Sequence, residues 1–203
     1  TMSTPTVCAI VLDYYGAEIT KKCLTSLIGQ GLKTIYVLDN SQNGEAAATL
    51  HKAVDQVRAQ GTDFATEVIS TGTNLGFGKG VNFVIAHDQQ AQSPHNYYML
   101  LNNVSRDASE REQGIWYHRY LGLLGSRPGR FRFHYFTGCC LLLPSRLVSE
   151  APLFDEAFFM YGEDLDLCFR AQKSGFKVYY VHNTEIIHYK GESTKRSSLD
   201  ETK

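Results

Sequence analysis

The sequence lacks an excess of charge of either sign. Its 203 residues include 20 Lys and Arg and 21 Asp and Glu, for a formal net charge of −1. General nucleic-acid binding therefore has no electrostatic support, and we predict no nucleic-acid partner. A local basic patch is still compatible with the sequence, because six arginines lie within one short region. They are Arg106, Arg111, Arg119, Arg127, Arg130 and Arg132.

The sequence also lacks a cysteine framework and a membrane-spanning run. Its five cysteines are odd in number and include no C-x-x-C, so they are predicted to be buried thiols in a reducing compartment. This excludes disulfides and favours no zinc site. No apolar run reaches the length of a membrane span, and the first residues show no signal-peptide pattern. We expect a cytoplasmic protein.

Strand-like and helix-like segments alternate through the first half of the chain. Apolar, β-rich runs predict strands, and helical spacing of apolar residues predicts helices between them. The strands are expected at 7–15, 33–40, 66–70 and 96–102, and the helices at 17–31, 44–61 and 79–92. Nearly continuous apolar strands separated by amphipathic helices indicate a parallel α/β sheet covered on both faces.

This regularity ends after residue 102. Residues 104–136 are polar and rich in arginine, which predicts a long irregular connection. A strand is expected at 139–144, a helix from about Glu163 to Ser174, and one or two strands within "KVYYVHNTEIIHY". The polar tail at 194–203 is expected to fray. Neither a repeat nor a linker is evident, so a single domain is predicted.

Polar residues follow the apolar strands where those strands end. Ligands bind at this edge in open α/β sheets, which makes Asp13, Asp39, Asn40, Asn102 and Asn103 candidate binding residues. For Asp39 two interpretations are equally good. Its carboxylate could accept from a ribose hydroxyl or a base N–H, or it could cap a turn with the residues that follow it.

The segment "NLGFGKGVN" places Gly76, Gly78 and Gly80 just before a predicted helix. Glycines let a backbone approach a ligand closely, and a helix N-terminus favours anions. The spacing matches neither the P-loop nor the dinucleotide fingerprint, and such segments are often only loops.

Three acids begin the last predicted helix, at Glu163, Asp164 and Asp166. Acids at a helix N-terminus interact well with its dipole, which is a sufficient structural reason for them. The segment "FDEAFFMY" before them, however, is too apolar for an exposed helix start. We therefore expect the acids at the edge of a partly buried cleft, where one serves as a general base and the others position it. Arg170 is a possible partner for one acid.

Read together, these segments resemble the family 2 glycosyltransferases, and among them the bacterial rhamnosyltransferase-like branch. The resemblance covers about residues 7–193. Its motifs are "VLDYYGAEITKKCLTSL", "IYVLDNSQNGE", "NLGFGKGVNFVI", "YYMLLNN", "TGCCLLLPSRL", "FDEAFFMYGEDLDLCFRAQKSGFKVYYV" and "IIHYKGES". Each motif is modest evidence, but their joint order is specific.

The resemblance implies a GT-A fold, a Rossmann-like mostly parallel sheet in one domain. Residues 7–102 would form the nucleotide-sugar-binding half and 137–193 the acceptor and catalytic half. It implies inverting transfer of a sugar from a nucleotide diphosphate donor, carrying dTDP or UDP, to an alcohol. Asp164 would be the base, a choice the residues alone leave open. The donor site would include Asp39 and the segment 74–82, with Asn74, Phe77 and Asn82 beside the glycines.

The resemblance further implies a divalent cation, Mn²⁺ or Mg²⁺, with His188 as a metal or diphosphate ligand. On its own, a histidine at a strand end is more often structural. The family ends its fourth strand with L-N-P-D or L-N-N-D, whereas this chain reads Leu101-Asn102-Asn103-Val104. Because carboxylates are the usual ligands of such cations, Asp107 could substitute, or Arg and Lys could neutralise the diphosphate, or the chain could be inactive.

Two functions from different classes follow. The first is an active glycosyltransferase, possibly moving rhamnose, in cell-surface polysaccharide or glycolipid synthesis. Its acceptor would be a glycan or a lipid-linked sugar, reached from the cytoplasmic face of the membrane with or without peripheral association. The second is a non-catalytic sugar-nucleotide-binding module that has lost the metal motif. A nucleotidyltransferase ranks below both, because the first strand lacks a Gly-rich, basic triphosphate signature.

Overall fold

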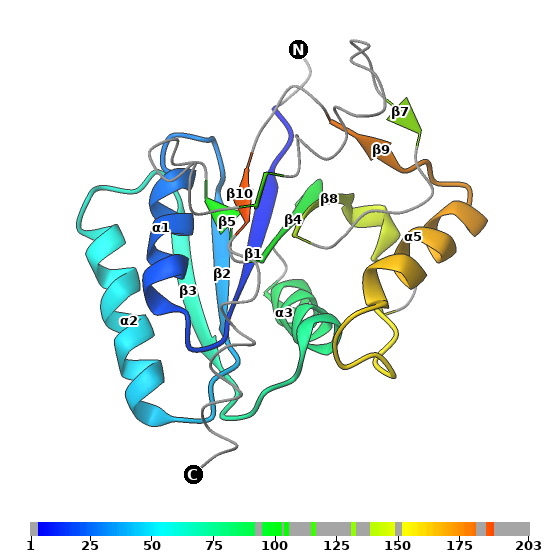
Figure 1. Cartoon of the computed structure of the whole chain (residues 1–203). Coiled ribbons are helices and arrows are strands. Elements are labelled where there is room, and N and C mark those ends of the chain that lie inside the picture. The colour runs from blue at the N-terminus through cyan, green and yellow to red at the C-terminus, as the bar shows by residue number, and fades with distance from the viewer. Residues whose placement is uncertain are drawn as a thin grey trace.

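A computed structural model describes residues 4–91, 95–102, 104–105, 115–116, 131–132, 139–148, 152–181 and 186–188. Its centre is a five-stranded sheet, shown in Figure 1. In sheet order the strands are β3 (Ala65–Ser70), β2 (Thr34–Asp39), β1 (Val7–Asp13), β4 (Tyr97–Asn102) and β8 (Cys140–Pro144). The first four are parallel, and β8 joins β4 antiparallel at the edge. The prediction of a mostly parallel α/β sheet is confirmed.

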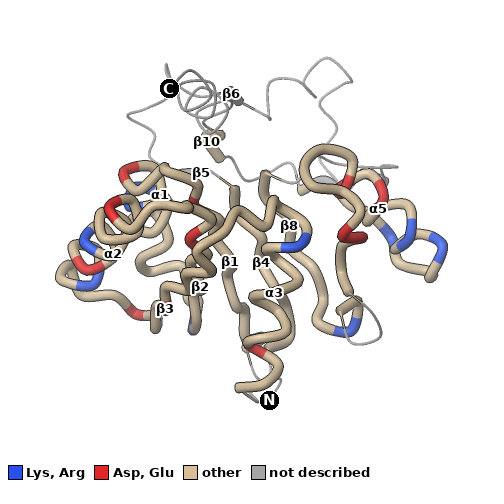
Figure 2. The backbone as a smooth tube through the Cα atoms, turned by 90° about the horizontal axis from the view of Figure 1, so that it is seen from below, with Lys and Arg blue, Asp and Glu red and all other residues tan. Residues whose placement is uncertain are grey.

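Helices cover both faces of this sheet. Figure 2 shows α1 (Ala17–Leu27) and α2 (Gly44–Arg58) on one side and α3 (Phe77–Gln90) on the other. The predicted helices are therefore present, although α1 ends four residues before Gly31. Helix α2 begins where the Asn43 side chain accepts a hydrogen bond from the Glu45 amide at 2.8 Å, which satisfies one of the free donors of its first turn.

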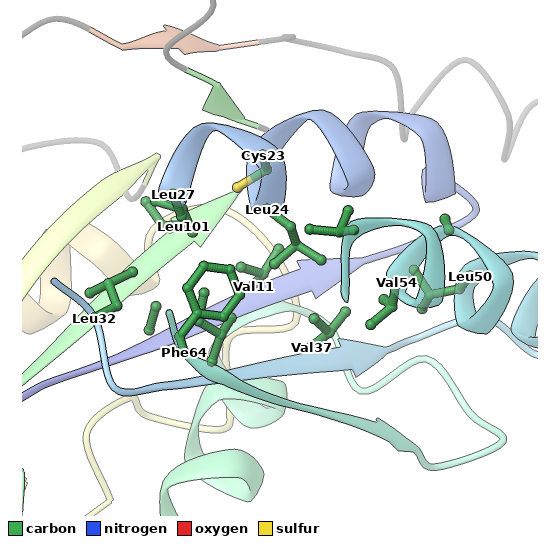
Figure 3. Close-up of a cluster of buried hydrophobic side chains, with 14 of the residues drawn as sticks. Val11, Cys23, Leu24, Leu27, Leu32, Val37, Leu50, Val54, Phe64 and Leu101 are labelled. Atoms are coloured by element: carbon green, nitrogen blue, oxygen red, sulfur yellow. The ribbon is translucent and has the colours of Figure 1, made fainter. Parts of the chain in front are cut away.

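Two hydrophobic clusters result, one on each face. The first lies between the sheet and the helices α1 and α2, and Figure 3 shows Val11, Leu24, Val37, Leu50 and Val54 meeting there. The second lies between the sheet and α3, where Ile10, Leu38, Val81 and Leu100 contact the buried Phe154 and Leu167 from later in the chain. Because β1 alternates between the two clusters, every residue of β1 after Val7 is buried, as the continuous apolar run predicts.

The last large element is α5 (Glu163–Lys173), preceded by the short 3₁₀ turn η3 (Ser145–Leu147) and the loop 152–162. Helix α5 ends before Ser174 and Gly175, where Gly175 has a φ of 85°. This left-handed position is one that glycine adopts easily, so the predicted helix stop is confirmed.

In the segment predicted to be an irregular connection, the described residues form three two-residue strands. They are β5 (Val104–Ser105), β6 (Ile115–Trp116) and β7 (Phe131–Arg132). They pair with strands from the end of the chain, because β10 (Ile187–His188) lies between β5 and β6, and β9 (Tyr179–Tyr180) pairs with β7. Sequence pattern missed these strands, because two residues are too short for a periodic signal. The predicted frayed tail, 194–203, lies outside the described residues.

All five cysteines are free thiols, and Cys140 is the one that is not fully buried. The prediction of buried thiols without disulfides is therefore confirmed. Within the part of the chain that the structure describes, no helix has both the length and the apolar character needed to cross a membrane.

Candidate functional site

Two buried aspartates stand side by side where β1 and β2 end, since Asp13 is paired with Asp39 in the parallel register. The Asp13 carboxylate accepts hydrogen bonds from the Thr20 hydroxyl at 2.6 Å and from the Gly16 amide at 3.2 Å. These contacts hold the turn that leads into α1. The Asp13 carboxylate thus binds residues of the turn that follows it. It does so at the carboxyl end of a parallel strand, where ligands bind in open α/β sheets.

Asp39 is engaged in the same way. One carboxylate oxygen accepts from the Ser41 amide at 2.8 Å and the other from the Ser70 hydroxyl at 2.9 Å. The first contact is the turn cap that the sequence offered as one interpretation. A carboxylate has about four lone-pair sites, so these two bonds leave capacity for a ligand hydroxyl. Both interpretations of Asp39 therefore remain open.

Asn40 connects this edge to the glycine-rich segment. Its side-chain amide donates to the Gly76 carbonyl at 3.1 Å and accepts from the Leu75 amide at 3.4 Å. The Asn74 side chain in turn accepts from the Gly76 amide at 2.9 Å. The predicted binding residues Asn40, Asn74 and Gly76 thus lie together, and they shape the turn that begins α3.

The three glycines each permit a close contact within the protein. A Cβ on Gly76 would lie 2.2 Å from the Phe159 carbonyl oxygen, and one on Gly78 would lie 2.9 Å from the Phe154 Cβ. A Cβ on Gly80 would lie 2.7 Å from a methyl of Leu38. Such separations are shorter than a packed core tolerates, so these glycines bring α3 against β2 and against the loop 152–162. A close approach of backbone to ligand stays a prediction.

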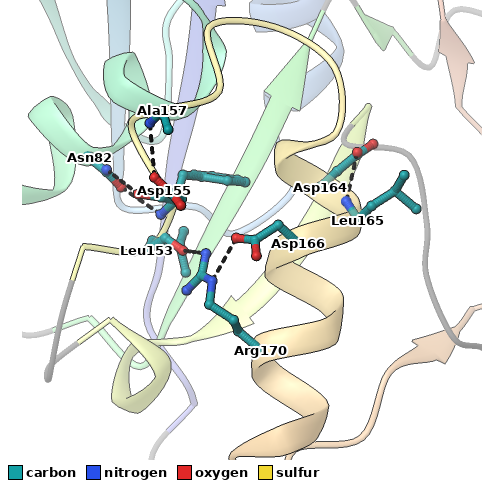
Figure 4. A network of polar contacts seen from close by, with 9 residues as sticks. Asn82, Leu153, Asp155, Ala157, Asp164, Leu165, Asp166 and Arg170 are labelled. Atoms are coloured by element: carbon teal, nitrogen blue, oxygen red, sulfur yellow. Dashed lines mark hydrogen bonds and ion pairs between the residues drawn. The ribbon is translucent and has the colours of Figure 1, made fainter.

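The loop 152–162 is fastened to α3 by polar contacts as well. Asn82 donates to the Phe154 carbonyl at 2.8 Å and accepts from the Phe154 amide at 2.9 Å, and the Phe159 carbonyl accepts from the Phe77 amide at 3.3 Å. Phe77 and Phe154 also meet edge to face. Figure 4 shows Asn82 directed at this loop, next to the first turn of α5. Two predicted donor-site residues, Phe77 and Asn82, thus connect the two halves of the protein.

The acids at the start of α5 have different surroundings. Glu163 is only 7% exposed, and its Oε2 has no hydrogen-bond partner among the described residues. Burial raises the pKa of Glu163; a backbone hydrogen bond opposes that rise, and the neighbouring Asp164 charge adds to it. Asp164 is half-buried, and its carboxylate accepts from the Leu165 amide at 2.8 Å.

Asp166 is held in an ion pair. Its carboxylate lies 2.7 Å from the Arg170 guanidinium, which also donates to the Leu153 carbonyl at 2.8 Å. Figure 4 shows Asp166 turned toward Arg170 while Asp164 points away on the other side of the helix turn. The expected partnership of Arg170 with an acid is confirmed, and it gives Asp166 a structural role.

The run before these acids is more exposed than its composition suggested. Phe159 and Met160 are exposed, and Tyr161 is 75% exposed, whereas Glu163 shortly after them is buried and Asp164 is half-buried. Tyr161 and Gly162 both have left-handed backbone, with φ of 69° and 94°, which is uncommon for tyrosine. Tyr161 and Gly162 turn the chain sharply into α5. Before the turn the side chains of Phe159 and Met160 are exposed, and after it the Glu163 side chain is buried.

The histidine expected to bind metal lies opposite the position of the missing acid. His188 in β10 is directly paired with Val104 in β5, two residues beyond the end of β4. Asn103 and Asp107, the other predicted donor or metal residues here, lie outside the described residues. Asn102 ends β4 and donates its amide to the Cys139 carbonyl at 3.0 Å. Among the residues that are described, His188 is not part of any group of three metal-ligating side chains.

A hollow of about 710 Å³ lies elsewhere, between η3 and the second half of α5. Arg146, Arg170 and Lys173 line it together with apolar side chains. None of the predicted site residues contributes to its lining, so it is separate from the candidate site.

Sequence reasoning missed several residues that support the candidate site. Thr20 and Ser70 hold the two aspartates, and the Phe159 backbone closes the contact with α3. Tyr15 also has left-handed backbone, with a φ of 54°, and its hydroxyl accepts from the Gln42 amide at 3.3 Å. Backbone strain of this kind is concentrated at functional sites, but nothing in the side-chain pattern predicts it.

Comparisons with known proteins agree with this geometry. A model of the family described as "Glycosyltransferase like family 2" matches residues 115–202. A mannosyltransferase from Pyrobaculum calidifontis, solved in complex with GDP-Man and Mn²⁺, superimposes with a TM-score of 0.60 over 86% of this chain and 54% of its own, at 14% identity. Over residues 115–202 the chain is thus similar to the family 2 glycosyltransferases. At such low identity the structural likeness establishes the GT-A fold and nothing further.

Curated relatives place the domain near the rhamnosyltransferases. An N-acetylglucosaminyl-diphospho-decaprenol L-rhamnosyltransferase of Mycobacterium tuberculosis is 40% identical over 62 residues, which are 30% of this chain and 20% of that protein. The rhamnosyltransferase WbbL of Escherichia coli is 47% identical over 36 residues, 18% of this chain and 14% of its own length. The match thus spans about a fifth or less of these relatives. The predicted resemblance is confirmed for the glycosyltransferase domain.

Proposed function

We propose that this glycosyltransferase domain transfers a sugar, with inversion, from a nucleotide diphosphate donor to an alcohol, and that Asp164 is the general base. The proposal is supported by one observation: a series of contacts joins the strand ends in the first half of the chain to the loop and helix α5 in the second half. Asn40 joins the strand edge to Gly76, and the contacts of Gly76 and Asn82 with the loop 152–162 set the first turn of α5 beside that edge. A nucleotide at the strand ends and a base on α5 would then face a common space.

Asp164 suits the role of base better than its two neighbours. Asp166 is held in an ion pair with Arg170, so its carboxylate is already occupied. Glu163 is only 7% exposed, so an acceptor hydroxyl has little access to its carboxylate. Asp164 is half-buried and directed away from the ion pair, so an acceptor hydroxyl can come within hydrogen-bond reach.

The donor would lie along the strand ends, with Asp39 accepting from the nucleoside and the 74–82 segment beside the diphosphate. The residues described near His188 do not by themselves form a site for Mn²⁺ or Mg²⁺, since the position paired with it is Val104. We therefore propose that a divalent ion binds mainly together with the donor, whose phosphate oxygens complete its ligands.

The acceptor is proposed to be a lipid-linked sugar, in line with the decaprenol-linked substrate in the name of the mycobacterial relative. Exposed apolar side chains surround the start of α5, a distribution that soluble surfaces usually avoid. They are Phe159, Met160, Tyr161, Leu165 and Phe169. This face also fits peripheral contact with the membrane that would present such an acceptor.

The test is a transfer assay with purified protein. Candidate donors are dTDP-rhamnose, UDP-N-acetylglucosamine and GDP-mannose, each supplied with a prenyl-diphosphate sugar acceptor in detergent. We expect transfer from the deoxythymidine donor, with proton NMR showing an inverted anomeric centre. A product of retained configuration would refute the mechanism, and transfer from another donor alone would refute the rhamnosyl assignment.

A second function is favoured by one observation, Val104 in place of the family's aspartate. A domain without the metal acid could bind a sugar nucleotide without turning it over. The two functions differ in donor hydrolysis, because an active transferase leaks sugar slowly to water in the absence of acceptor. Tight nucleotide binding with neither hydrolysis nor transfer would establish the binding module.

A further inference from the structure

A buried polar network lies at the opposite end of the sheet from the candidate site. Asp88, near the end of α3, is fully buried, and its carboxylate accepts three hydrogen bonds. One oxygen accepts from the Tyr36 hydroxyl at 3.0 Å and lies 3.2 Å from the His95 Nε2, and the other accepts from the Tyr98 hydroxyl at 2.7 Å. The carboxylate is therefore fixed in orientation by donors from β2, β4 and the residue before β4.

The charge of this network is not balanced. In the described part of the chain, the only ion-pair partner of Asp88 is His95, whose side chain is 5% exposed. The other ring nitrogen, His95 Nδ1, is buried without a hydrogen-bond partner there. The buried carboxylate therefore has no Lys or Arg partner in that part of the chain.

A third ligand-type side chain completes the group. Cys8 on β1 is fully buried, and one ligand atom each from Cys8, Asp88 and His95 lies within 4.8 Å of the others. Burial, and then the charge of Asp88, raise the pKa of the Cys8 thiol far above its ordinary value, so the thiol is protonated when no cation is present. Thiolate, imidazole and carboxylate are the three side chains that bind Zn²⁺.

We propose that Cys8, Asp88 and His95 form a structural zinc site. The spacing of cysteines in the sequence gave no reason to expect one, because Cys8 lies 80 residues before Asp88 and the fold brings it to the Asp88–His95 pair. Zn²⁺ binding displaces the Cys8 thiol proton to solvent and forms a Zn–S bond. His95 binds through an unprotonated Nε2, so its one ring proton moves from Nε2 to Nδ1 and no second proton is released. Two positive charges then meet one thiolate and one carboxylate, and the interior becomes neutral.

The geometry needs little change to accept the ion. Two N or O ligands, each about 2.0 Å from tetrahedral zinc, stand about 3.3 Å apart, and the Asp88 and His95 atoms are already 3.2 Å apart. A sulfur ligand stands about 3.5 Å from the others, so Cys8 has at most roughly 1 Å to move. Tyr36 and Tyr98 remain as donors that orient the carboxylate, a role that outer hydrogen bonds commonly play at zinc sites.

The ion would join three elements of the fold. Cys8 is paired with Tyr98 across β1 and β4, and Asp88 belongs to the helix that covers them. Asp13 and Cys8 lie at opposite ends of β1, about 17 Å apart at roughly 3.3 Å per residue. The zinc is therefore distinct from any cation that accompanies the donor, and its effect is on stability.

The test uses tag-free protein stripped of metal with a chelator and titrated with Co²⁺, whose thiolate complexes absorb strongly in the near ultraviolet. We expect one Co²⁺ per chain, the thiolate absorption band, and release of one proton per metal in calorimetry across buffers. Cys8→Ser should lose the band. Cys23→Ser, which removes an equally buried thiol on α1, should retain it.

His95→Gln provides a second variant in case Cys8→Ser fails to fold. The glutamine amide can still donate to Asp88, so the network persists while a ligand is lost, and Zn²⁺ affinity should fall by about 10–100-fold or more. The absence of a thiolate band in the wild type overturns the proposal and leaves a hydrogen-bonded network. A band that persists in Cys8→Ser overturns it as well, by assigning the metal to another cysteine.

Discussion

The acids at the strand ends and the acids at the start of α5 differ in what holds them. Asp13 and Asp39 each accept two short hydrogen bonds from neighbouring turns, so their carboxylates are fixed before any ligand arrives. At α5, Asp166 is similarly fixed, whereas Glu163 is buried with an unpartnered oxygen and Asp164 is half-exposed. The strand-end acids thus form a fixed edge that suits ligand binding, whereas the acids at α5 differ from one another in burial and in contacts.

The largest expected effect tests the second group. Asp164→Asn should lower the transfer rate by about 10²–10⁴-fold, because the general base is lost, with little change in donor affinity. Asp166→Asn is the matched control. It should reduce stability, through loss of the Arg170 pair, more than it reduces rate. Single-turnover kinetics would measure both, and near-normal turnover by Asp164→Asn would assign the base elsewhere.

The connection between the two groups can be broken at Gly76. Gly76→Ala places a Cβ against the Phe159 carbonyl at a left-handed φ, and we expect a loss of about 3 kcal/mol in the free energy of unfolding. Gly72→Ala is a close control, since its φ is also left-handed but its surroundings are open. It should cost only about 1–2 kcal/mol. Urea denaturation of both variants measures the difference, and equal losses would contradict the close contact.

The strand-end group is tested by donor binding. Asp39→Ala should weaken nucleoside diphosphate binding by about 1.5–3 kcal/mol through loss of a charge-assisted hydrogen bond. Ser70→Ala removes one internal donor and leaves the carboxylate available, so it should bind the nucleotide nearly as well as the wild type. Calorimetric titration distinguishes the two. An unchanged dissociation constant for Asp39→Ala would make this residue a turn cap only.

A new acid can be added at the same edge. Val104→Asp places a carboxylate opposite His188, and the affinity for Mn²⁺ should rise about tenfold or more, since a charged oxygen ligand is gained. The measurement is a metal titration of wild type and variant, with and without nucleoside diphosphate. Tight Mn²⁺ binding by wild-type protein without nucleotide would show that another acid already holds the metal.

The smallest expected effect concerns Glu163. Its raised pKa means that the folded protein holds the proton more tightly than the unfolded chain. This contribution favours folding below the unfolded pKa and is lost as pH rises through the folded pKa. Wild type should therefore lose stability relative to Glu163→Gln as the pH rises from 4 to 8, which urea denaturation at each pH measures. A stability difference that does not change with pH would refute the assignment.

Much of the fold could be predicted from sequence because its signals are local. The run 7–13 is apolar throughout since both faces of β1 are buried, and the helices have one apolar side each. The candidate site was predictable as a set of polar residues after strands. The role of each residue in the site was not predictable, because Asn82 and Gly78 act through contacts with residues more than 70 positions later. The zinc ligands were missed for the same reason.

The contact between α3 and the loop 152–162 has a consequence for how the domain could be re-engineered. At Gly76 and Asn82, main-chain atoms of Phe159 and Phe154 are partners on the loop, and the Phe159 ring and the Glu156 side chain contribute as well. Met160 and Tyr161 follow with exposed side chains. We therefore expect a selection library confined to Met160 and Tyr161 to yield mostly folded variants, in which an effect on acceptor preference can be measured.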